Sequence, residues 1–370
     1  MTELLTSPLH AEHEKLGATF TAFGPWNMPL KYQNELDEHR AVRSTAGLFD
    51  LSHMGEIWVN GSDASKFLSY AFISNFEPLK VGKAKYSMIT AEDGGIIDDL
   101  ITYRFEEDKF LVVPNAGNAD TVWDELNKRA EGFDVTLKNE SQDVAMIAVQ
   151  GPKAAEILVP LVEDNKQDEV YNLGYYAATM GKVARTFAII ARTGYTGEDG
   201  FELIVYNSDA PQLWEELLKA GEEYDLKPCG LAARDSLRLE AGMPLYGNEL
   251  SRDITPVEAG MARAFAKKEA DFVGSEVIRQ RAADGPQVAI TGLTSTQRRA
   301  ARAGAEVFVG DKKVGTVTSG QPSPTLGHPV AIALLETSAE LEPGAEVEVE
   351  IRGKRYPFEV TALPFYKRDK

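Results

Sequence analysis

The chain after about Gly285 carries six short strand-like segments in close succession, and this run constrains the fold more than any other feature. Each segment is rich in apolar residues, and Gly310-Asp311 and Arg352-Gly353 supply turns between them. Closely spaced short strands with turn signals predict a small β-barrel or sandwich. We therefore place a boundary near residue 280 and a C-terminal β domain over 281–370. The segments are 288–293, 305–309, 313–318, 330–335, 346–351 and 356–361.

Upstream of this domain, strand-like and helix-like segments mix without a regular βαβ alternation. That order favours an α+β fold over a doubly wound sheet. A helix is predicted from Gln150 to Val162, although Pro160 disturbs its last turn. The other expected helices are 34–46, 61–68, one beginning at Pro211, and 230–241. The expected strands are 56–60, 99–105, 110–113, 187–190 and 201–205.

The composition narrows the possible functions. The chain has 370 residues, 43% hydrophobic and 26% charged, so its length suggests two or three domains. No apolar run approaches the roughly 20 residues that a membrane helix needs, and the N-terminus lacks a signal pattern. We therefore expect a cytoplasmic protein. The net charge of −18 disfavours binding to nucleic acid or to an anionic membrane.

Several common catalytic motifs are missing from the sequence. It contains no Gly-x-Gly-x-x-Gly motif, P-loop or His-Glu-x-x-His motif, and the five histidines form no convincing metal set. The single cysteine, Cys229, cannot form an internal disulfide, and we predict that it is a small core residue. Chemistry here would therefore rest on carboxylates and on positioning, with no metal.

One expected strand begins with two adjacent carboxylates, Asp98 and Asp99. Alternate residues of a strand share a face, so Asp99 lies with Ile101 and Tyr103 on an apolar face. Asp98 lies on a mixed face. A carboxylate on an apolar face costs several kcal/mol unless it is paired, and functional sites tolerate that cost. The alternative is a turn aspartate that caps nearby backbone amides.

A glycine-rich loop over 192–203 is the second candidate site. Its three glycines allow the backbone to approach a flat ligand, and Tyr195 offers a stacking face and a hydroxyl. Glu202 stands between apolar residues at the start of a strand, and a buried glutamate suits a ligand with adjacent N–H donors, such as a pterin edge. The alternative is a hairpin loop with a salt-bridged glutamate.

The helix expected over 230–241 supplies the third candidate. Arg234 and Arg238 lie four residues apart on one helix face, where they could clamp a carboxylate. Ion pairs within the helix, with Asp235 or Glu240, are the alternative. The spacing does not choose between the two arginines.

Together these segments resemble the aminomethyltransferase, or T-protein, family of the glycine cleavage system. The resemblance covers nearly the whole chain, and its matching motifs extend from Pro8 to Gly327. The matching motifs lie at 8–10, 24–30, 49–56, 94–100, 150–152, 192–203, 230–241, 255–260, 272–274 and 319–327.

The resemblance implies an α+β, multidomain, three-lobed and cloverleaf-like fold, with tetrahydrofolate in a central channel. It divides the chain into a folate-binding region over 1–280 and a barrel over 281–370, the former made of two lobes, roughly 1–50 with 140–280, and 51–139. By motif, Asp99 is the catalytic carboxylate. His53 falls in a family motif and is interpreted as structural. The implied folate-pocket residues are Tyr86, Asn115, Tyr195, Glu202, Arg234 and Lys367.

The family's reaction moves an aminomethyl carbon from the lipoyl arm of H-protein to tetrahydrofolate, which releases ammonia and gives 5,10-methylenetetrahydrofolate. The resemblance therefore implies lipoylated H-protein and tetrahydrofolate as partners. Two alternatives share the scaffold: a folate-dependent demethylase and a non-enzymatic folate-binding iron–sulfur maintenance factor. The maintenance factors carry a cysteine in the glycine-rich loop, and this chain has none there. The folate module of a flavin-dependent oxidase would bring an N-terminal dinucleotide-binding domain, which the chain lacks.

Overall fold

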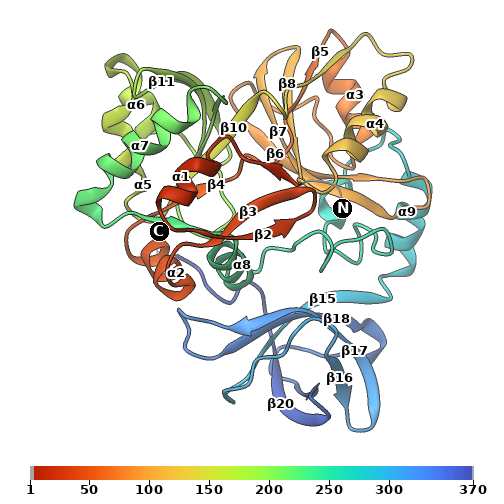
Figure 1. The fold of residues 1–370 in the computed structure, drawn as a ribbon. Helices are drawn as coiled ribbons and strands as arrows, with labels where there is room; N and C mark the ends of the chain where they lie inside the picture. The colour runs from red at the N-terminus through yellow and green to blue at the C-terminus, as the bar shows by residue number, and fades with distance from the viewer. Residues whose placement is uncertain (1–3, 369–370) are drawn as a thin grey trace. The chain divides into compact units, whose positions relative to one another are not determined.

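The computed structural model describes residues 4–368, whose helices and strands are labelled in Figure 1. The chain divides into two compact units. Helices alternate irregularly with strands of several sheets, which confirms the predicted α+β class. Within residues 4–368, no helix is long and apolar enough to cross a membrane. Of the described residues, the first unit comprises 4–69, Phe76–Ser87 and Leu100–Arg234, and the second comprises Tyr70–Asn75, Met88–Asp99 and 235–368.

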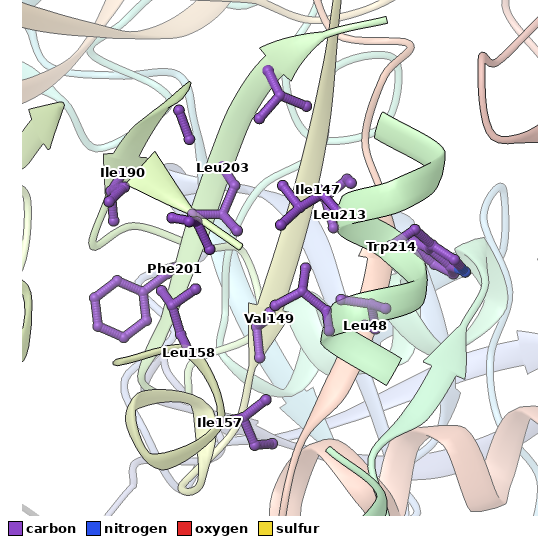
Figure 2. Close-up of a cluster of buried hydrophobic side chains, with 14 of the residues drawn as sticks. Leu48, Ile147, Val149, Ile157, Leu158, Ile190, Phe201, Leu203, Leu213 and Trp214 are labelled. Atoms are coloured by element: carbon purple, nitrogen blue, oxygen red, sulfur yellow. The ribbon is translucent and has the colours of Figure 1, made fainter. Parts of the chain in front are cut away.

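The largest sheet of the first unit is built around β10 (Val144–Gln150), a strand whose seven residues are all buried. Alternate β10 side chains, including Ile147 and Val149, join the main hydrophobic cluster with Leu213 and Trp214 of one covering helix (Figure 2). Burying one such large side chain stabilises a fold by about 1.5–3 kcal/mol. The strand order is β11 (Ala178–Val183), β12 (Thr186–Ala191), β13 (Gly200–Tyr206), β10, β4 (Gly47–Asp50) and β14 (Lys227–Cys229).

Helices cover this sheet where the sequence supplies apolar stripes. Asn34 caps the helix that follows it by accepting a hydrogen bond from the Leu36 amide. Cys229 is buried at the sheet edge, as predicted. The helices of this region are α1 (His10–Lys15), α2 (Glu35–Ser44), α5 (Ala154–Leu158), α6 (Gln167–Tyr171) and α7 (Ala210–Ala220).

The helix predicted from Gln150 is shorter than expected. Gln150 is the last residue of β10, and Gly151 turns the chain with a φ of 138°, which favours glycine. The α-helix begins at Ala154 and ends at Leu158, where a 3-10 turn that contains Pro160 follows. Proline has no N–H to continue the α-helical hydrogen bonds, so the disturbance extends over more than the last turn.

Two further sheets complete the strands upstream of the barrel. A small sheet has the order β1 (Leu5–Thr6), β3 (Trp26–Lys31) and β2 (Thr19–Phe23). The other has the order β6 (Ala84–Thr90), β7 (Ile96–Glu106), β8 (Lys109–Pro114), β5 (Ile57–Asn60) and β9 (Thr136–Asn139), and it is accompanied by α3 (Ala64–Ala71) and α4 (Ala119–Arg129).

The six C-terminal strands close into a barrel, as the sequence predicts. Closure leaves no exposed sheet edge, and the alternating Val347 and Val349 of one strand point into the barrel core. Leu239, near the end of α8 (Leu231–Glu240), packs on Val330 and Ile332 of the barrel. The barrel order is β15 (Val288–Thr294), β18 (Pro329–Glu336), β17 (Lys312–Pro322), β16 (Glu306–Val309), β19 (Glu346–Ile351) and β20 (Lys354–Thr361).

Several elements continue from one unit into the other along the chain, among them β6, β7 and α8 (Leu231–Glu240). As a result, neither unit is one continuous stretch of sequence. The remaining elements are α9 (Ser275–Asp284) and the 3-10 turns Val159–Leu161, Asp164–Lys166, Glu222–Tyr224, Ala262–Ala264 and Thr337–Ala339.

Candidate active-site residues

Glu202 stands on β13 within a small polar cluster of the first unit. Thr193 Oγ1 donates a hydrogen bond to Glu202 Oε2. The Tyr103 hydroxyl lies 2.9 Å from Thr193 Oγ1 and 3.5 Å from Glu202 Oε2. Burial raises the pKa of Glu202 above its ordinary value, although the Thr193 hydrogen bond and the charge of Arg234 oppose that change. The sequence suggested a buried glutamate, but Glu202 is only partly buried, and its ionisation responds to the donors around it.

The glycine-rich loop before Glu202 is held in place by the side chain of Gln150. Gln150 Nε2 donates to the Thr193 carbonyl at 3.0 Å, and Thr196 Oγ1 donates to Gln150 Oε1 at 3.0 Å. A Cβ on Gly194 would lie only 1.9 Å from Gln150 Oε1. The Gln150 amide therefore fills the space over Gly194, and a side chain at this position would have to displace it. The approach of a flat ligand to this loop stays a prediction.

A buried ion pair anchors the other end of this loop. Arg43 Nη1 lies 2.9 Å from Glu198 Oε1 and donates to the Thr196 carbonyl at 2.7 Å. Arg192 also bonds to both carboxylate oxygens of Asp199. The salt-bridged glutamate of the loop is therefore Glu198, and it leaves Glu202 to the threonine and tyrosine hydroxyls.

Arg234 of α8 stacks on Tyr195 of the same loop. The guanidinium carbon lies 4.7 Å from the centre of the tyrosine ring, within the range of a cation–π contact. His53 feels the same positive charge: burial, followed by Arg234, lowers the pKa of His53 to about 3. The imidazole is therefore neutral, and it packs edge-on against Phe23 with the ring centres 5.3 Å apart.

The two arginines of α8 are distinguished clearly. Arg238 is 1% exposed and bonds to Glu249 Oε2 at 2.9 Å, to Asp235 Oδ1 at 2.8 Å and to Ser319 Oγ at 2.8 Å. Arg238 is thus committed to structure in the second unit. Arg234 is partly exposed and has an aromatic ring as its neighbour.

Asn115 and Tyr86 lie in the first unit, on or beside strands of the five-stranded sheet. Asn115 directly follows β8, and its neighbour Ala116 packs in a cluster with Trp26, Met28 and the α8 residue Leu231. Tyr86 occupies the third position of β6 and is partly exposed. Their roles in ligand binding stay predictions.

Asp98 and Asp99 belong to the second unit, on β7. Asp98 is fully buried, and Asp99 is only partly buried, so the apolar face that Asp99 shares is the more accessible face of the strand. The apolar composition of that face did not mean complete burial. Asp99 is therefore the more accessible of the two carboxylates.

The segment from Tyr246 to Ile254 holds the beginning of β7. The Tyr246 hydroxyl donates to the Ile96 carbonyl at 3.0 Å, and Arg252 Nη1 donates to the Gly95 carbonyl at 2.8 Å. The Ile96 amide donates to the Ile254 carbonyl at 3.0 Å. Burial raises the pKa of Tyr246, and the charges of Asp98 and Asp99 add to the effect. This segment therefore fixes the backbone just before the two aspartates.

Lys367 and Arg368 end the described part of the second unit. Lys367 is exposed, whereas Arg368 is partly buried and its Nη1 atom is shielded from solvent. Within residues 4–368, no group of three or more His, Cys, Asp or Glu side chains has the arrangement of a metal site.

The sequence analysis missed four residues that hold the first-unit cluster and loop, namely Thr193, Tyr103, Gln150 and Arg43. Tyr103 could have been noticed because it shares a β7 face with Asp99, but Arg43 and Gln150 reach the loop only through the tertiary fold. The first unit holds Tyr86, Asn115, Tyr195, Glu202 and Arg234, and the second holds Asp99 and Lys367.

Comparison with known proteins identifies the family. The GCVT N-terminal domain matches residues 9–269, and the glycine cleavage T-protein C-terminal barrel domain matches 289–367. An aminomethyltransferase of Corynebacterium aurimucosum is 83% identical over 370 residues and is covered, like this chain, over 100% of its length. An aminomethyltransferase of Streptomyces coelicolor is 51% identical, over 100% of this chain and 99% of that protein. The crystal structure of glycine cleavage system aminomethyltransferase T from Bartonella henselae is 40% identical, superimposes with a TM-score of 0.91 and covers 98% of each chain.

These matches extend over both the α+β region and the barrel, and together they define one class of transferase. The chain belongs to the glycine cleavage T-protein family. It is accordingly an aminomethyltransferase of the glycine cleavage system, as the sequence resemblance predicts.

Proposed function

We propose that this enzyme transfers the aminomethyl carbon from the lipoyl arm of H-protein to tetrahydrofolate. The carbon leaves its sulfur and its amino nitrogen and becomes bonded to two folate nitrogens. The two folate N–H protons end on the lipoyl thiol and on ammonia, so the atoms balance. Tetrahydrofolate is the acceptor substrate, lipoylated H-protein is the donor, and the proposal places the reaction in the cytoplasm.

The partly buried carboxyl of Glu202 is the observation that carries this proposal. It has a raised pKa and lies beside the hydroxyls of Thr193 and Tyr103. A pterin presents adjacent N–H groups along one edge, and a carboxylate can accept two of them in parallel. On this proposal, a bound pterin would draw Glu202 into its ionised form, and Thr193 would hold the carboxylate in one orientation.

Arg234 and Tyr195 give the first unit a second contact for folate. The tyrosine ring already lies against the guanidinium group, so a flat ligand could continue the same stack. His53 is neutral near Arg234, because burial and the arginine charge lower its pKa to about 3. It therefore adds no second positive charge to this part of the unit. Tyr86 and Asn115 are assigned to the same pocket from the family motif.

Asp99 is proposed as the catalytic carboxylate. It is the accessible member of the Asp98–Asp99 pair, and its backbone is held by Tyr246 and Arg252. A fixed negative charge near the reacting folate nitrogens would stabilise the cationic character that develops there, and the carboxylate would also move a proton. For the folate glutamate tail, we propose Arg368 beside Lys367, because Arg368 is the less exposed and can form a forked contact with a carboxylate.

Ammonia release tests the proposal. Aminomethyl-lipoyl H-protein should release ammonia rapidly with this enzyme and tetrahydrofolate, and release should fall by at least about 100-fold when tetrahydrofolate is omitted. A parallel reaction with methylated donors separates the demethylase alternative. Rapid turnover of those donors together with inert aminomethyl-lipoyl H-protein would overturn the proposed reaction.

A further inference from the structure

An open groove of about 610 Å³ lies in the first unit, lined by residues from both its five-stranded and its six-stranded sheets. Glu56, Trp58 and Asn60 line one wall, at alternate positions along the chain into and through β5. Ile204 and Tyr206 of β13 line the opposite wall. The volume falls within the range of about 300–1,000 Å³ that is usual for small-molecule sites.

The wall formed by the six-stranded sheet is apolar and aromatic. Phe187 is 53% exposed and Tyr206 is 57% exposed, values that are high for large hydrophobic side chains. Between them, Ile189 pairs with Ile204 across β12 and β13. An exposed group of apolar side chains beside polar ones is typical of a binding surface.

The wall that includes β5 contains a buried carboxyl group whose oxygens have no hydrogen-bond partner among the described residues. Glu56 is 2% exposed, and neither of its carboxyl oxygens has a hydrogen-bond partner among the described residues. Its backbone is fixed, because its amide bonds to Ser141 Oγ at 2.8 Å and its carbonyl accepts from the Glu140 amide at 2.9 Å. A buried acceptor that lacks a donor costs about 1–3 kcal/mol, so a ligand that supplies donors would recover that energy.

Four other charged side chains of the groove, those of Lys138, Glu140, Lys109 and Glu106, are already engaged. Lys138 and the Trp58 indole both bond to the carboxylate of Glu140. Lys109 lies 3.6 Å from Glu106 and its ammonium is 5.1 Å from the Trp58 ring. With Asp108 also lining the groove, acids outnumber bases there, and the groove favours a cation over an anion.

We propose that this groove binds a flat, mostly apolar molecule with an amidine- or guanidine-like head, and that the head donates two parallel N–H groups to the Glu56 carboxylate. The two vacant oxygens of one carboxylate match such a head in spacing and direction. The rings of Trp58 and Phe187 provide surfaces for the flat body. This site does not involve Glu202 or the aminomethyl transfer proposed above.

Benzamidine is the probe, because it joins a flat ring to an amidinium head. Calorimetric titration of the full chain should give saturable binding with a dissociation constant of roughly 0.1–1 mM, a reasonable affinity for so small a ligand. Benzoate has the same ring but no N–H donors, and it should bind at least about tenfold more weakly. Absence of saturable benzamidine binding up to about 10 mM, or equal binding of benzoate, would overturn the proposal.

Variants locate the binding. E56Q should weaken benzamidine binding at least about tenfold, and F187S should weaken it about threefold or more. Tyr171, 59% exposed and outside the lining of the groove, provides the matched control, since Y171S should bind as the wild type does. E202Q should also leave benzamidine binding unchanged. Loss of binding in E202Q but not in E56Q or F187S would place the probe elsewhere and refute the groove.

Discussion

In each unit a buried ion pair anchors a segment near the predicted carboxylate, and the two pairs differ in how completely they are buried. In the first unit, Arg43 and Glu198 form a buried ion pair, 8% and 3% exposed, that anchors the glycine-rich loop before Glu202. In the second unit, Arg238 and Glu249 form a pair only 1% and 0% exposed that anchors the segment before Tyr246 and Arg252. Each pair acts on backbone next to a functional residue, and neither includes the functional residue itself.

The two carboxylates differ in which part of the residue the surrounding structure holds. Glu202 is enclosed by the hydroxyls of Thr193 and Tyr103, which suits a group that recognises N–H donors. At Asp99, hydrogen bonds from Tyr246 and Arg252 fix the neighbouring backbone, and the side chain is partly exposed, which suits a group that meets a reacting centre. The two carboxylates are thus similarly accessible, and they differ in what the structure fixes: a side-chain oxygen of Glu202, and the backbone beside Asp99.

The largest expected effect comes from Asp99. D99N should lower turnover by roughly 10³–10⁴-fold, because an amide can neither stabilise the developing cation nor move the proton. Its folate affinity should stay within about tenfold of the wild type, since Asp99 is proposed to act on the transition state. Stopped-flow folate binding and ammonia release would measure both. Near-normal turnover in D99N would remove the proposed division of roles.

Breaking the two ion pairs compares their structural importance. R238M should lower the free energy of unfolding by about 3–5 kcal/mol, because it leaves Glu249 buried without its partner. R43M should cost less, since the loop that it anchors lies beside solvent-accessible residues and is also held by Gln150. Denaturant unfolding of both variants gives the comparison. A larger loss in R43M than in R238M would show that the first-unit loop is the more dependent of the two.

Glu202 sharpens the comparison through its response to pH. E202Q should raise the folate KM by about 10–100-fold, because a neutral amide replaces the carboxylate that accepts the pterin donors. The raised pKa of Glu202 means that the folded protein holds this proton more tightly than the unfolded chain. Ionisation therefore opposes folding, and stability is lost as pH rises from about 4.3 towards the raised pKa. The stability of E202Q relative to the wild type should increase over that interval, and a constant difference between pH 4 and pH 8 would contradict the assignment.

The C-terminal basic residues extend the comparison to the second unit. R368A should raise the KM for a polyglutamylated folate by about tenfold, and K367A should change it by less than about twofold. The exposed Lys367 serves as the neighbouring control for the partly buried Arg368. Steady-state kinetics with mono- and polyglutamyl folates would measure the two effects. The reverse order would return the role to Lys367.

The smallest expected effect tests the backbone support of Asp99. Y246F removes the hydrogen bond to the Ile96 carbonyl and should cost about 1 kcal/mol of stability, with a several-fold fall in turnover and an unchanged folate KM. Y171F, at an exposed tyrosine, is the control. A change in KM without a change in turnover would show that Tyr246 acts on folate binding instead.

The sequence predicted the C-terminal barrel well, because its strands are short, alternate in polarity and are separated by local turn signals. It also located the loop and the helix that carry Tyr195, Glu202 and Arg234. It failed where distant side chains decide the structure. Nothing in the local pattern indicates that Gln150 ends a strand and fills the space over Gly194, or that Arg43 reaches Glu198 across a sequence separation of 155 residues.

The two arginines of α8 show the same limit. Their spacing is symmetrical, so the local sequence cannot rank them. Arg238 bonds to Glu249, 11 residues away, and to Ser319, 81 residues away, and the fold of the second unit brings both to it. The exposure of Asp99 was likewise hidden, since apolar neighbours on a strand can line an accessible surface as well as a core.

The chain passes between the two units after Ser69, Asn75, Ser87, Asp99 and Arg234. A ribosome therefore releases the early pieces of the second unit long before the residues from Asp235 onward that complete it. Those segments, covalently linked to the first unit, cannot complete their packing until the C-terminal residues have been synthesised. Neither unit can be excised by a single cut, and truncations intended to isolate one of them will carry orphaned segments of the other.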